Sequence, residues 1–467
     1  MMVEIHTNRI CLAEKKYIFQ LVLHEFLGVE FVLVLDDNLC DIRIVRNEKK
    51  IVLNAAFFQQ FIDKKWLSPD TLPSLPLEFV SADISRENPT NYPVLYGKAE
   101  YKVTDNVIEI GLDVFGSSFF MLSRYEEIIV KAKDSHGRFP VRESIAFKEN
   151  LLLRPIVDEY VELLWEHLHF LWPSLRRKNE TPQTFISCDV DHIWDKGIRF
   201  PGIFSRLVAD VLKRRSLIRF MDSLRLFFVV NVLGKREKDP FRSFQFMMDE
   251  CERRKLQMAF YFIPRNEKKG IDGYYDIESE EVVQLMGEII KRGHEVGYHG
   301  SYDSYKDKEK TLEEINLLRK VYRKAGGNPN DIKGGRQHYL RWETGVTEKN
   351  WEAAGMEYDS TLGYAEHIGF RCGTAREYNF YDSIERKALN LKIRPLIIME
   401  VSMFNKNYMG LNEEKALATA TNLFNKLKTK NVNLTLLWHN SSFETKKRKQ
   451  TFITLLREMH KKAQNPI

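Results

Sequence analysis

The sequence has no apolar stretch long enough to cross a membrane. Its most apolar internal run covers residues 226–233, far fewer than the roughly 20 residues that a membrane-spanning helix needs. Charged and polar residues interrupt the first nine positions, where an export signal would need an unbroken apolar run. We therefore expect no transmembrane segment, no export signal and a cytoplasmic location.

Cysteine is scarce and scattered. The five cysteines form no C-x-x-C pair and are odd in number, so the sequence predicts neither a disulfide framework nor a zinc site built from thiolates. The pattern is typical of a protein in a reducing compartment.

A strong excess of one charge is also missing. The net charge is +6, and the 71 basic and 65 acidic residues are heavily interleaved, which is typical of a mixed solvated surface and not of a nucleic-acid-binding stripe. We expect no nucleic-acid partner. One stretch, 213–238, has basic residues around an apolar segment; peripheral contact with a membrane surface is one interpretation, and a packed loop or lid is the favoured one.

Length and composition predict two domains. A chain of 467 residues with 43% hydrophobic side chains exceeds one ordinary domain and can bury a sizeable core. Residues 1–153 hold short apolar runs separated by polar turns and read as a smaller α/β domain whose role the sequence leaves open. A helix and linker follow at 154–183, and a larger domain occupies 184–467.

The larger domain alternates strand and helix patterns. Repeated alternation of this kind predicts parallel strands joined by right-handed crossovers, and the number of repeats suits a distorted (β/α) barrel, complete or incomplete. In such barrels the chemistry gathers at the C-terminal ends of the strands. The predicted strands are 184–190, 257–263, 295–299, 332–337, 395–402 and 433–439.

Unusual polar residues follow three of these strands. The first strand runs into Asp189 and Asp191, whose side chains share one face because strand side chains repeat every second residue. Paired carboxylates at a buried strand end repel one another, which points to a bound cation or a perturbed acid–base pair. If the chain turns helically after His299, Asp303 lies on the same face and the two side chains could hold one ion.

The last strand ends in Trp438 and His439. A lone histidine is usually a structural core residue. A functional role for His439 is therefore indicated only because other polar residues also follow strands. Trp438, with Tyr298 and Tyr302, could form an apolar floor for a sugar ring or an acetyl methyl group, and could equally belong to the core.

These motifs resemble those of a known family. Asp189 and Asp191, then G-H-E-V-G-Y-H-x-x-x-D ending at Asp303, then Arg336 to Tyr339, then Leu437 to His439 come in the order found in the polysaccharide deacetylases of carbohydrate esterase family 4, the NodB-homology domain. The resemblance covers about 184–443. Two positions depart from the family pattern: Asp303 stands where the family has a histidine, and His338 where it usually has proline.

The resemblance implies a metal centre. The family holds a divalent metal, commonly zinc, with an aspartate and two histidines, which would correspond here to Asp191, His299 and Asp303. The oxygen-rich set that results leaves cobalt, manganese or nickel open beside zinc.

The resemblance also implies catalytic roles. Asp189 would be the general base, and Arg336 would orient it and keep it ionised. The backbone N–H of Tyr339 would stabilise the oxyanion, and His439 would protonate the departing amine. The implied activity is hydrolysis of an N-acetyl group from a sugar or polysaccharide precursor, so the expected partner is an N-acetylated carbohydrate.

Two other functions fit the same residues. A degenerate protein that retains the fold and binds glycans without turnover is one, because Asp303 and His338 depart from the family pattern. A hydrolase of another carbon–nitrogen bond is the second, because the metal and acid–base groups would be the same.

Overall fold

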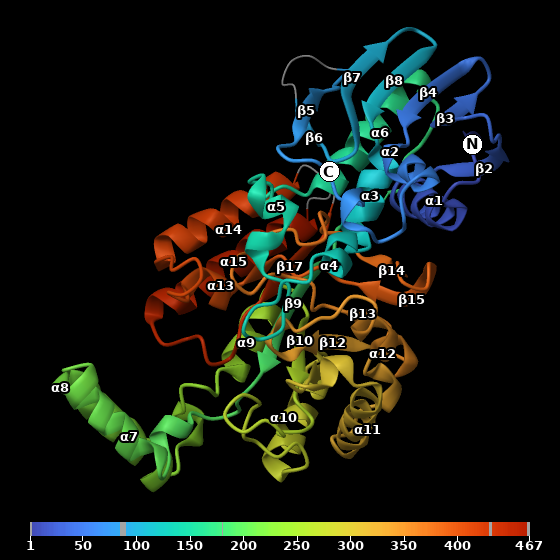
Figure 1. The fold of residues 1–467 in the computed structure, drawn as a ribbon. Coiled ribbons are helices and arrows are strands. Elements are labelled where there is room, and N and C mark those ends of the chain that lie inside the picture. Colours follow the sequence, from blue (N-terminus) through green and yellow to red (C-terminus); the bar gives the residue numbers. More distant parts are fainter. Residues whose placement is uncertain (1, 85–89, 180, 429–431, 465–467) are drawn as a thin grey trace.

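The computed structural model describes residues 2–84, 90–179, 181–428 and 432–464. It contains two main sheets, one in each half of the chain (Figure 1). The predicted α/β class is confirmed in both halves. Glu180, within the predicted linker, lies outside the described residues.

The N-terminal half is built on a six-stranded mixed sheet in the order β2-β1-β3-β4-β8-β7. Alternate side chains of β1, such as Val3 and Ile5, are buried, as expected for a sheet with one face on a core. Helix α6 (Ile156–Leu171), which the sequence predicts, packs against α3 (Val114–Leu122). The strands of this sheet are β1 (Met2–Thr7), β2 (Glu30–Leu35), β3 (Asp41–Arg46), β4 (Lys49–Asn54), β7 (Gly97–Val103) and β8 (Val107–Leu112), and β5 (Glu78–Ser81) and β6 (Asn91–Val94) form a separate ribbon. Helices α1 (Leu12–Phe19) and α2 (Ala56–Gln59) lie between strands in the chain, and α4 (Tyr125–Ile129) and α5 (Ile145–Lys148) follow β8.

The C-terminal half is built on a nine-stranded sheet in the order β14-β15-β13-β12-β11-β10-β9-β17-β16. All neighbouring pairs are parallel except β14 with β15. The order follows the chain from β9 to β15 and returns through β16 and β17 to β9, as in a (β/α) barrel. Among the described residues no ladder joins β15 to β16, so the sheet is open at that seam. The strands are β9 (Thr184–Val190), β10 (Met258–Phe262), β11 (Glu295–Gly300), β12 (Gly334–Gln337), β13 (Tyr358–Asp359), β14 (Tyr378–Asp382), β15 (Lys387–Ile393), β16 (Ile398–Met399) and β17 (Leu434–Leu437).

Amphipathic helices cover this sheet. In α10 (Glu280–Lys291) the buried residues Val282, Leu285, Met286 and Ile289 recur every three or four positions, so one stripe faces the core. The predicted strand 395–402 is wrong in its second half, because α13 (Glu400–Phe404) begins directly after β16. The other helices are α9 (Phe244–Glu252), α11 (Lys308–Lys324), α12 (Thr347–Ala353), α14 (Glu413–Lys428) and α15 (Lys446–Gln464).

Buried charges join the two halves. Glu127, just after α4 begins, accepts hydrogen bonds from the Arg371 guanidinium at 2.8 and 2.7 Å and from Arg124 Nε at 2.9 Å. All three side chains are at most 3% exposed. Removal of one partner would leave a buried charge without compensation, which is strongly destabilising.

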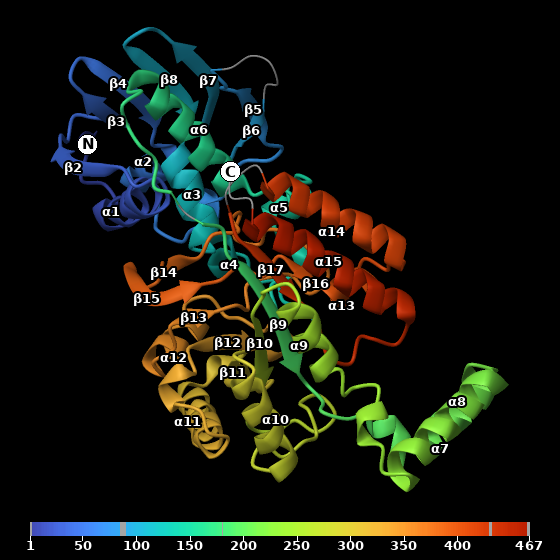
Figure 2. The same ribbon diagram turned by 180° about the vertical axis from the view of Figure 1, so that it is seen from behind.

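Residues 196–238 form a helical hairpin that projects from the body, with α7 (Gly202–Val208) and α8 (Leu217–Phe227) as its two arms (Figures 1 and 2). The packed loop expected for 213–238 is therefore wrong, and the alternative role as a lid stays a prediction. The apolar side chains of the hairpin are largely exposed.

Candidate metal centre

The polar residues expected at the strand ends meet at one edge of the C-terminal sheet. Asp189 belongs to β9, His299 to β11 and Arg336 to β12, and His439 follows β17. These strands are parallel, so their C-terminal ends lie at the same edge, where (β/α) proteins place their chemistry. The buried runs before each residue, such as Ile186 to Val190, hold the strands in the core.

Three side chains there form a compact group with the donor types of a metal site: Asp191, His299 and His338, whose ligand atoms lie within 4.8 Å of one another. Asp191 Oδ1 is 3.4 Å from His299 Nε2 and 3.5 Å from His338 Nε2. Bonds of 2.0–2.1 Å in a tetrahedral zinc site place neighbouring ligand atoms about 3.3 Å apart. The spacing therefore fits a small divalent cation.

Two of the three facing atoms in this group are buried without a hydrogen-bond partner. Asp191 Oδ1 and His299 Nε2 are both in this state, which is costly unless another group satisfies them. A divalent cation would satisfy both atoms at once.

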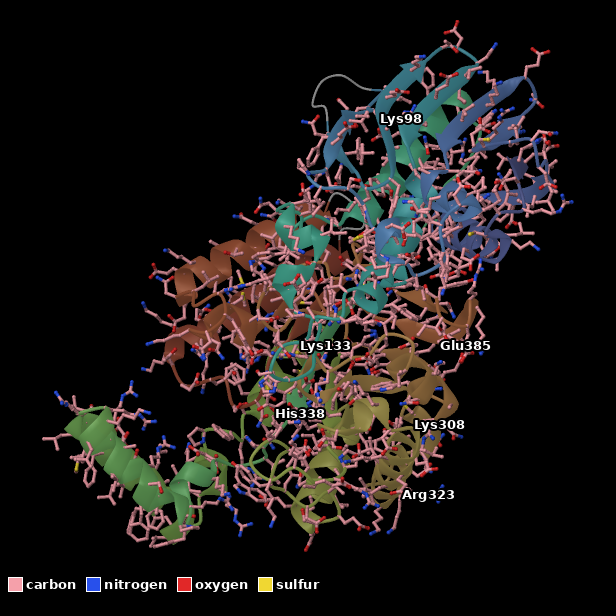
Figure 3. All side chains as sticks on the ribbon, viewed as in Figure 1. Lys98, Lys133, Lys308, Arg323, His338 and Glu385 are labelled. Atoms are coloured by element: carbon pink, nitrogen blue, oxygen red, sulfur yellow. The ribbon has the colours of Figure 1, made fainter. Side chains whose placement is uncertain are left out.

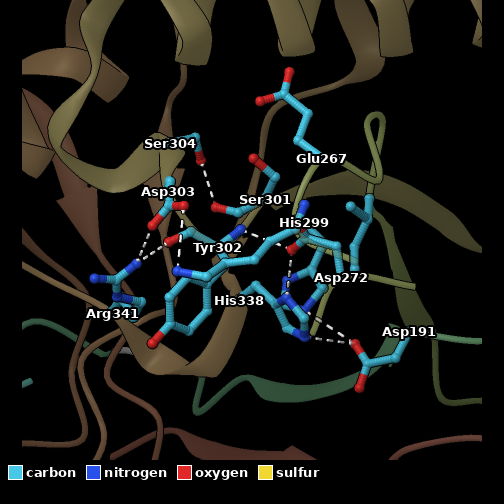
Figure 4. A network of polar contacts seen from close by, with 12 residues as sticks. Asp191, Glu267, Asp272, His299, Ser301, Tyr302, Asp303, Ser304, His338 and Arg341 are labelled. Carbon is cyan, nitrogen blue, oxygen red and sulfur yellow. Dashed lines mark hydrogen bonds and ion pairs between the residues drawn. The ribbon is translucent and has the colours of Figure 1, made fainter. Parts of the chain in front are cut away.

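The other nitrogen of each imidazole is held by an acceptor. His299 Nδ1 donates to the Arg336 carbonyl at 2.8 Å, and His338 Nδ1 lies 3.0 Å from Asp272 Oδ1. Such contacts fix the ring orientation and direct Nε2 toward a metal. Figure 4 shows the His338 ring between Asp272 and Asp191.

The charges of the group favour a bound cation. Burial acts to raise the pKa of Asp191, but His338, His299 and His439 hold it well below its usual range. Burial acts to lower the pKa of His299, but Asp189 and Asp191 raise it above its usual value. The carboxylates thus favour positive charge between these side chains, and either a proton or a metal ion can supply that charge.

Asp303 does not join this group. Its carboxylate accepts from Arg341 Nη1 at 2.8 Å and is 51% exposed, and Figure 4 shows it turned toward Arg341. The chain does not become helical after His299: β11 continues to Gly300, and the next helical turn starts only at Ser304. The four-residue spacing therefore does not put Asp303 beside His299, and His338 takes the third position.

Asp189 lies beside the triad and is tied to Arg336. Arg336 Nη1 donates to Asp189 Oδ1 at 2.6 Å, while Asp189 Oδ2 is 3.8 Å from His299 Nε2. Arg336 is fully buried and is itself held by the Ser360 carbonyl, at 2.8 Å from its Nε. One carboxylate oxygen is thus occupied by the guanidinium, and the other faces the triad.

His439 is paired with a buried carboxylate that the sequence analysis missed. Its Nδ1 lies 2.7 Å from Glu400 Oε1, and its Nε2 lies 3.8 Å from Asp191 Oδ2. Burial acts to lower the pKa of His439, but the Glu400 carboxylate outweighs it and the pKa is raised to about 10. The imidazole is therefore held protonated, with Nε2 toward the triad.

Of the two residues expected to contact substrate, Tyr339 lines the cavity and Trp438 does not. Tyr339 lines the cavity above the triad, and it and Leu340 have positive φ angles of 61° and 55°, a conformation that costs non-glycine residues about 1–3 kcal/mol each and tends to occur at functional sites. Trp438 is completely buried and stacks on Phe443. The floor role of Trp438 is therefore excluded, and the core alternative holds.

The triad opens into a cavity of about 520 Å³. This size is ordinary for a small-molecule site. Its lining combines the charged groups above with aromatic and apolar side chains, among them Tyr274, Tyr339, Tyr408, Leu340, Met399 and Val401.

The N-terminal half contributes one side chain to this cavity. Arg138 lines it and donates from Nη1 to the Tyr339 carbonyl at 3.1 Å. Asp134 fixes the guanidinium through Arg138 Nε at 2.7 Å. The backbone at Tyr339, with its positive φ, is therefore braced from the other half of the chain.

Sequence reasoning missed four residues of the site: His338, Asp272, Glu400 and Arg138. His338 stands next to Tyr339 in a recognised motif, so its imidazole could have been predicted as a metal ligand. No local pattern marks the other three, because each reaches the site from a segment distant in sequence.

Comparisons with known proteins cover both halves. A family model described as a family of unknown function (DUF7033) matches residues 3–173. A search of curated proteins finds no match.

Three solved structures are similar at low levels. A proposed polysaccharide deacetylase from Mycobacterium smegmatis is 13% identical, with a TM-score of 0.39 over 61% of this chain and 85% of that one. A 4-alpha-glucanotransferase from Thermococcus litoralis is 14% identical, with a TM-score of 0.31 over 59% of this chain and 36% of that one. An alpha-galactosidase I from Mortierella vinacea is 13% identical, with a TM-score of 0.23 over 46% and 55%.

Proposed function

We propose that the C-terminal half is a metal-dependent hydrolase that removes an N-acetyl group from a sugar or polysaccharide precursor. One observation carries this proposal: the facing atoms of Asp191, His299 and His338 have the spacing of metal ligands, beside a carboxylate and an imidazole that each have a buried partner. The order of the sequence motifs, which resembles that of polysaccharide deacetylases, supports the N-acetyl substrate.

Asp191, His299 and His338 would hold the metal. When bound, a divalent ion lowers the pKa of a coordinated water and polarises an amide carbonyl. Two imidazoles and one carboxylate are a donor set that zinc accepts readily in catalytic sites.

Asp189 is the general base in this proposal. Its Oδ2 faces the triad and takes a proton from the attacking water, while Arg336 on Oδ1 holds the carboxylate in position. The backbone N–H of Tyr339 donates to the amide oxygen as negative charge develops there.

His439 is the general acid. Its Nε2 gives a proton to the sugar nitrogen as the amide C–N bond breaks, which releases acetate and the free amine. Glu400 stabilises the protonated imidazole through Nδ1 before that transfer.

Acetate release tests the proposal. Purified protein supplied with zinc, cobalt, manganese or nickel should release acetate from some of a panel of N-acetylglucosamine oligomers and of nucleotide- and lipid-linked N-acetyl sugars. D189N should keep its metal and lose activity by at least about 10²-fold, because a general base typically contributes that much.

Release of an amine or ammonia from other amides, with no acetate from any N-acetyl sugar, would favour the hydrolase of another carbon–nitrogen bond. Glycan binding with no hydrolysis of any amide would favour the degenerate binding protein.

A further inference from the structure

The α7–α8 hairpin has an unusual distribution of apolar side chains. Twelve of the 23 large apolar side chains that are exposed in the described part of the chain lie in residues 200–233. The most exposed of them are Leu212 at 71%, Leu217 at 75% and Ile218 at 77%. Exposed apolar residues are normal when scattered singly, but a concentration of this kind marks a contact surface.

These side chains form stripes along both arms. Phe204, Val208 and Val211 are four and three positions apart on the first arm, where α7 continues as a helical turn to Lys213. On the second arm Leu217, Met221, Leu224 and Phe228 keep the same spacing. Positions three and four apart share a helix face, so each arm has one apolar face that points outward.

The inside of the hairpin is polar. Asp210 and Ser223, on opposite arms, are 1% and 2% exposed, and Ser223 Oγ donates to Asp210 Oδ2 at 2.7 Å. Arg206 Nε donates to Ser223 Oγ at 3.1 Å, and Arg214 Nη1 pairs with Asp210 at 2.5 Å. Polar groups between the arms and apolar groups outside reverse the usual arrangement of a helix pair in water.

The charge of the hairpin is strongly positive. Residues 196–238 contain eleven Lys and Arg and three Asp and Glu, a net charge of +8, whereas the rest of the chain has a net charge of −2. Lys213, Arg215 and Arg219 are exposed around the turn where Leu212, Leu217 and Ile218 also lie.

We propose that this hairpin docks the protein on an anionic lipid surface, with the apolar stripes in the headgroup–acyl boundary and the basic side chains on the headgroups. Helices with an apolar face and a basic face bind membranes in this way. A second copy of the chain would bring another charge of +8 to the contact, and nucleic acid would leave the outward leucine, isoleucine and phenylalanine side chains in water.

The docking differs from membrane spanning. No helix in the described residues is long and apolar enough to cross a bilayer. The hairpin begins next to the cavity, where Lys196 is a lining residue, so a docked hairpin holds the cavity close to the lipid surface.

Vesicle co-sedimentation of the full chain tests the proposal. The protein should sediment with vesicles of phosphatidylcholine and phosphatidylglycerol and much less with phosphatidylcholine alone, and high salt should weaken the binding because it screens the basic groups. The apolar variant L212S/L217S/I218S and the charge variant K213Q/R215Q/R219Q should each lose at least about tenfold in binding.

Matched variants elsewhere serve as controls. I62S/V103S/L312S removes exposed apolar side chains from other elements, and K98Q/K308Q/R323Q removes the same amount of exposed positive charge (Figure 3). Both controls should bind vesicles like the wild type. Circular dichroism of all four variants should match the wild type, because the substituted side chains are exposed.

Three outcomes would overturn the proposal. The first is that the wild type fails to bind the anionic vesicles, or that the two hairpin variants bind them as well as the wild type does. The second is a stable dimer by light scattering that becomes a monomer in L212S/L217S/I218S, which would assign the surface to a second copy. The third is tight binding to DNA or RNA that K213Q/R215Q/R219Q abolishes, with no binding to vesicles.

Discussion

The choice between Asp303 and His338 shows how one side chain changes the chemistry of the site. With Asp303 the donor set would be one imidazole and two carboxylates; with His338 it is two imidazoles and one carboxylate. The second set is softer and closer to the preference of zinc. In the proposed centre, His338 takes the place that the sequence analysis gave to Asp303.

Sequence reasoning identified five of the residues that meet at the site: Asp189, Asp191, His299, Arg336 and His439. Asp189, Asp191 and His439 follow apolar runs that are strong strand signals, so their places at strand ends could be predicted. His299 closes a shorter strand pattern, and Arg336 was placed by the order of the motifs, because glycines and a lysine precede it. The third member of the triad could not, because its prediction assumed a helical turn after His299 that the loop does not make.

The Glu400–His439 pair gives the first prediction. In E400Q the imidazole loses the carboxylate that favours its protonated form, so kcat for acetate release should fall about 10²-fold, in line with the usual contribution of an acid–base group. Metal content should stay at the wild-type level, because Glu400 is not among the ligands. Steady-state kinetics and elemental analysis of the same sample check both parts.

A variant at the C-terminal end of α13 controls for local damage. N405A changes a residue at the end of the same helix that also lines the cavity, and it should affect KM more than kcat. Unchanged kcat in E400Q would contradict the assigned role of the pair.

At the scale of elements, two predicted strands match the structure closely, whereas the two-residue strands were not predicted as such. The predicted strand 184–190 coincides with β9, and 295–299 matches β11 to within one residue. Strand β13 has two residues, and β16 ends after two because the chain turns into α13. Such short strands are stabilised by pairing with their neighbours in the sheet, and no local sequence pattern predicts them.

The loop from 130 to 140 gives the second prediction. Arg138 braces the Tyr339 carbonyl from the N-terminal half, so R138Q should lower kcat/KM by roughly tenfold, the effect of about 1.4 kcal/mol lost from one charged hydrogen bond. The metal should remain bound, because Arg138 does not touch the triad.

Lys133 offers a matched control on the same loop. Lys133, labelled in Figure 3, pairs with Glu343 outside the cavity. K133Q should therefore leave kcat/KM close to the wild-type value. Equal losses in R138Q and K133Q would show that the loop as a whole matters and that the guanidinium has no specific part.

At the scale of the whole molecule, the two halves are joined by the buried group of Glu127, Arg124 and Arg371. The domain boundaries drawn at 153 and 183 remain predictions, but this contact shows that the halves share buried charge. E127Q should lower the free energy of unfolding by about 3 kcal/mol, because the buried Arg371 guanidinium loses its carboxylate partner and Arg124 keeps only Glu126. Chemical denaturation followed by tryptophan fluorescence measures the change.

The same group predicts a pH dependence. Burial acts to raise the pKa of Glu127, but Arg371 and Arg124 outweigh it and lower the pKa from 4.5 to about 2. A carboxyl group whose pKa is lower in the folded than in the unfolded protein stabilises the folded state when the pH is above the unfolded pKa. The contribution of Glu127 is therefore complete above about pH 5 and is lost as the pH falls toward 2. The stability difference between wild type and E127Q should shrink over that interval.

An exposed carboxylate provides the comparison. Glu385, labelled in Figure 3, pairs with Lys349 and Lys387. Exposed pairs of this kind contribute little to stability. E385Q should therefore unfold at nearly the same denaturant concentration as the wild type. A loss as large in E385Q as in E127Q would contradict the special role of the buried group.

The central claim is the metal centre of Asp191, His299 and His338, and elemental analysis of purified variants tests it most directly. The wild type and D303N should each contain about one divalent ion per chain, whereas D191A, H299A and H338A should lose it. Metal retained in H338A and lost in D303N would contradict this centre and restore Asp303 as the third ligand.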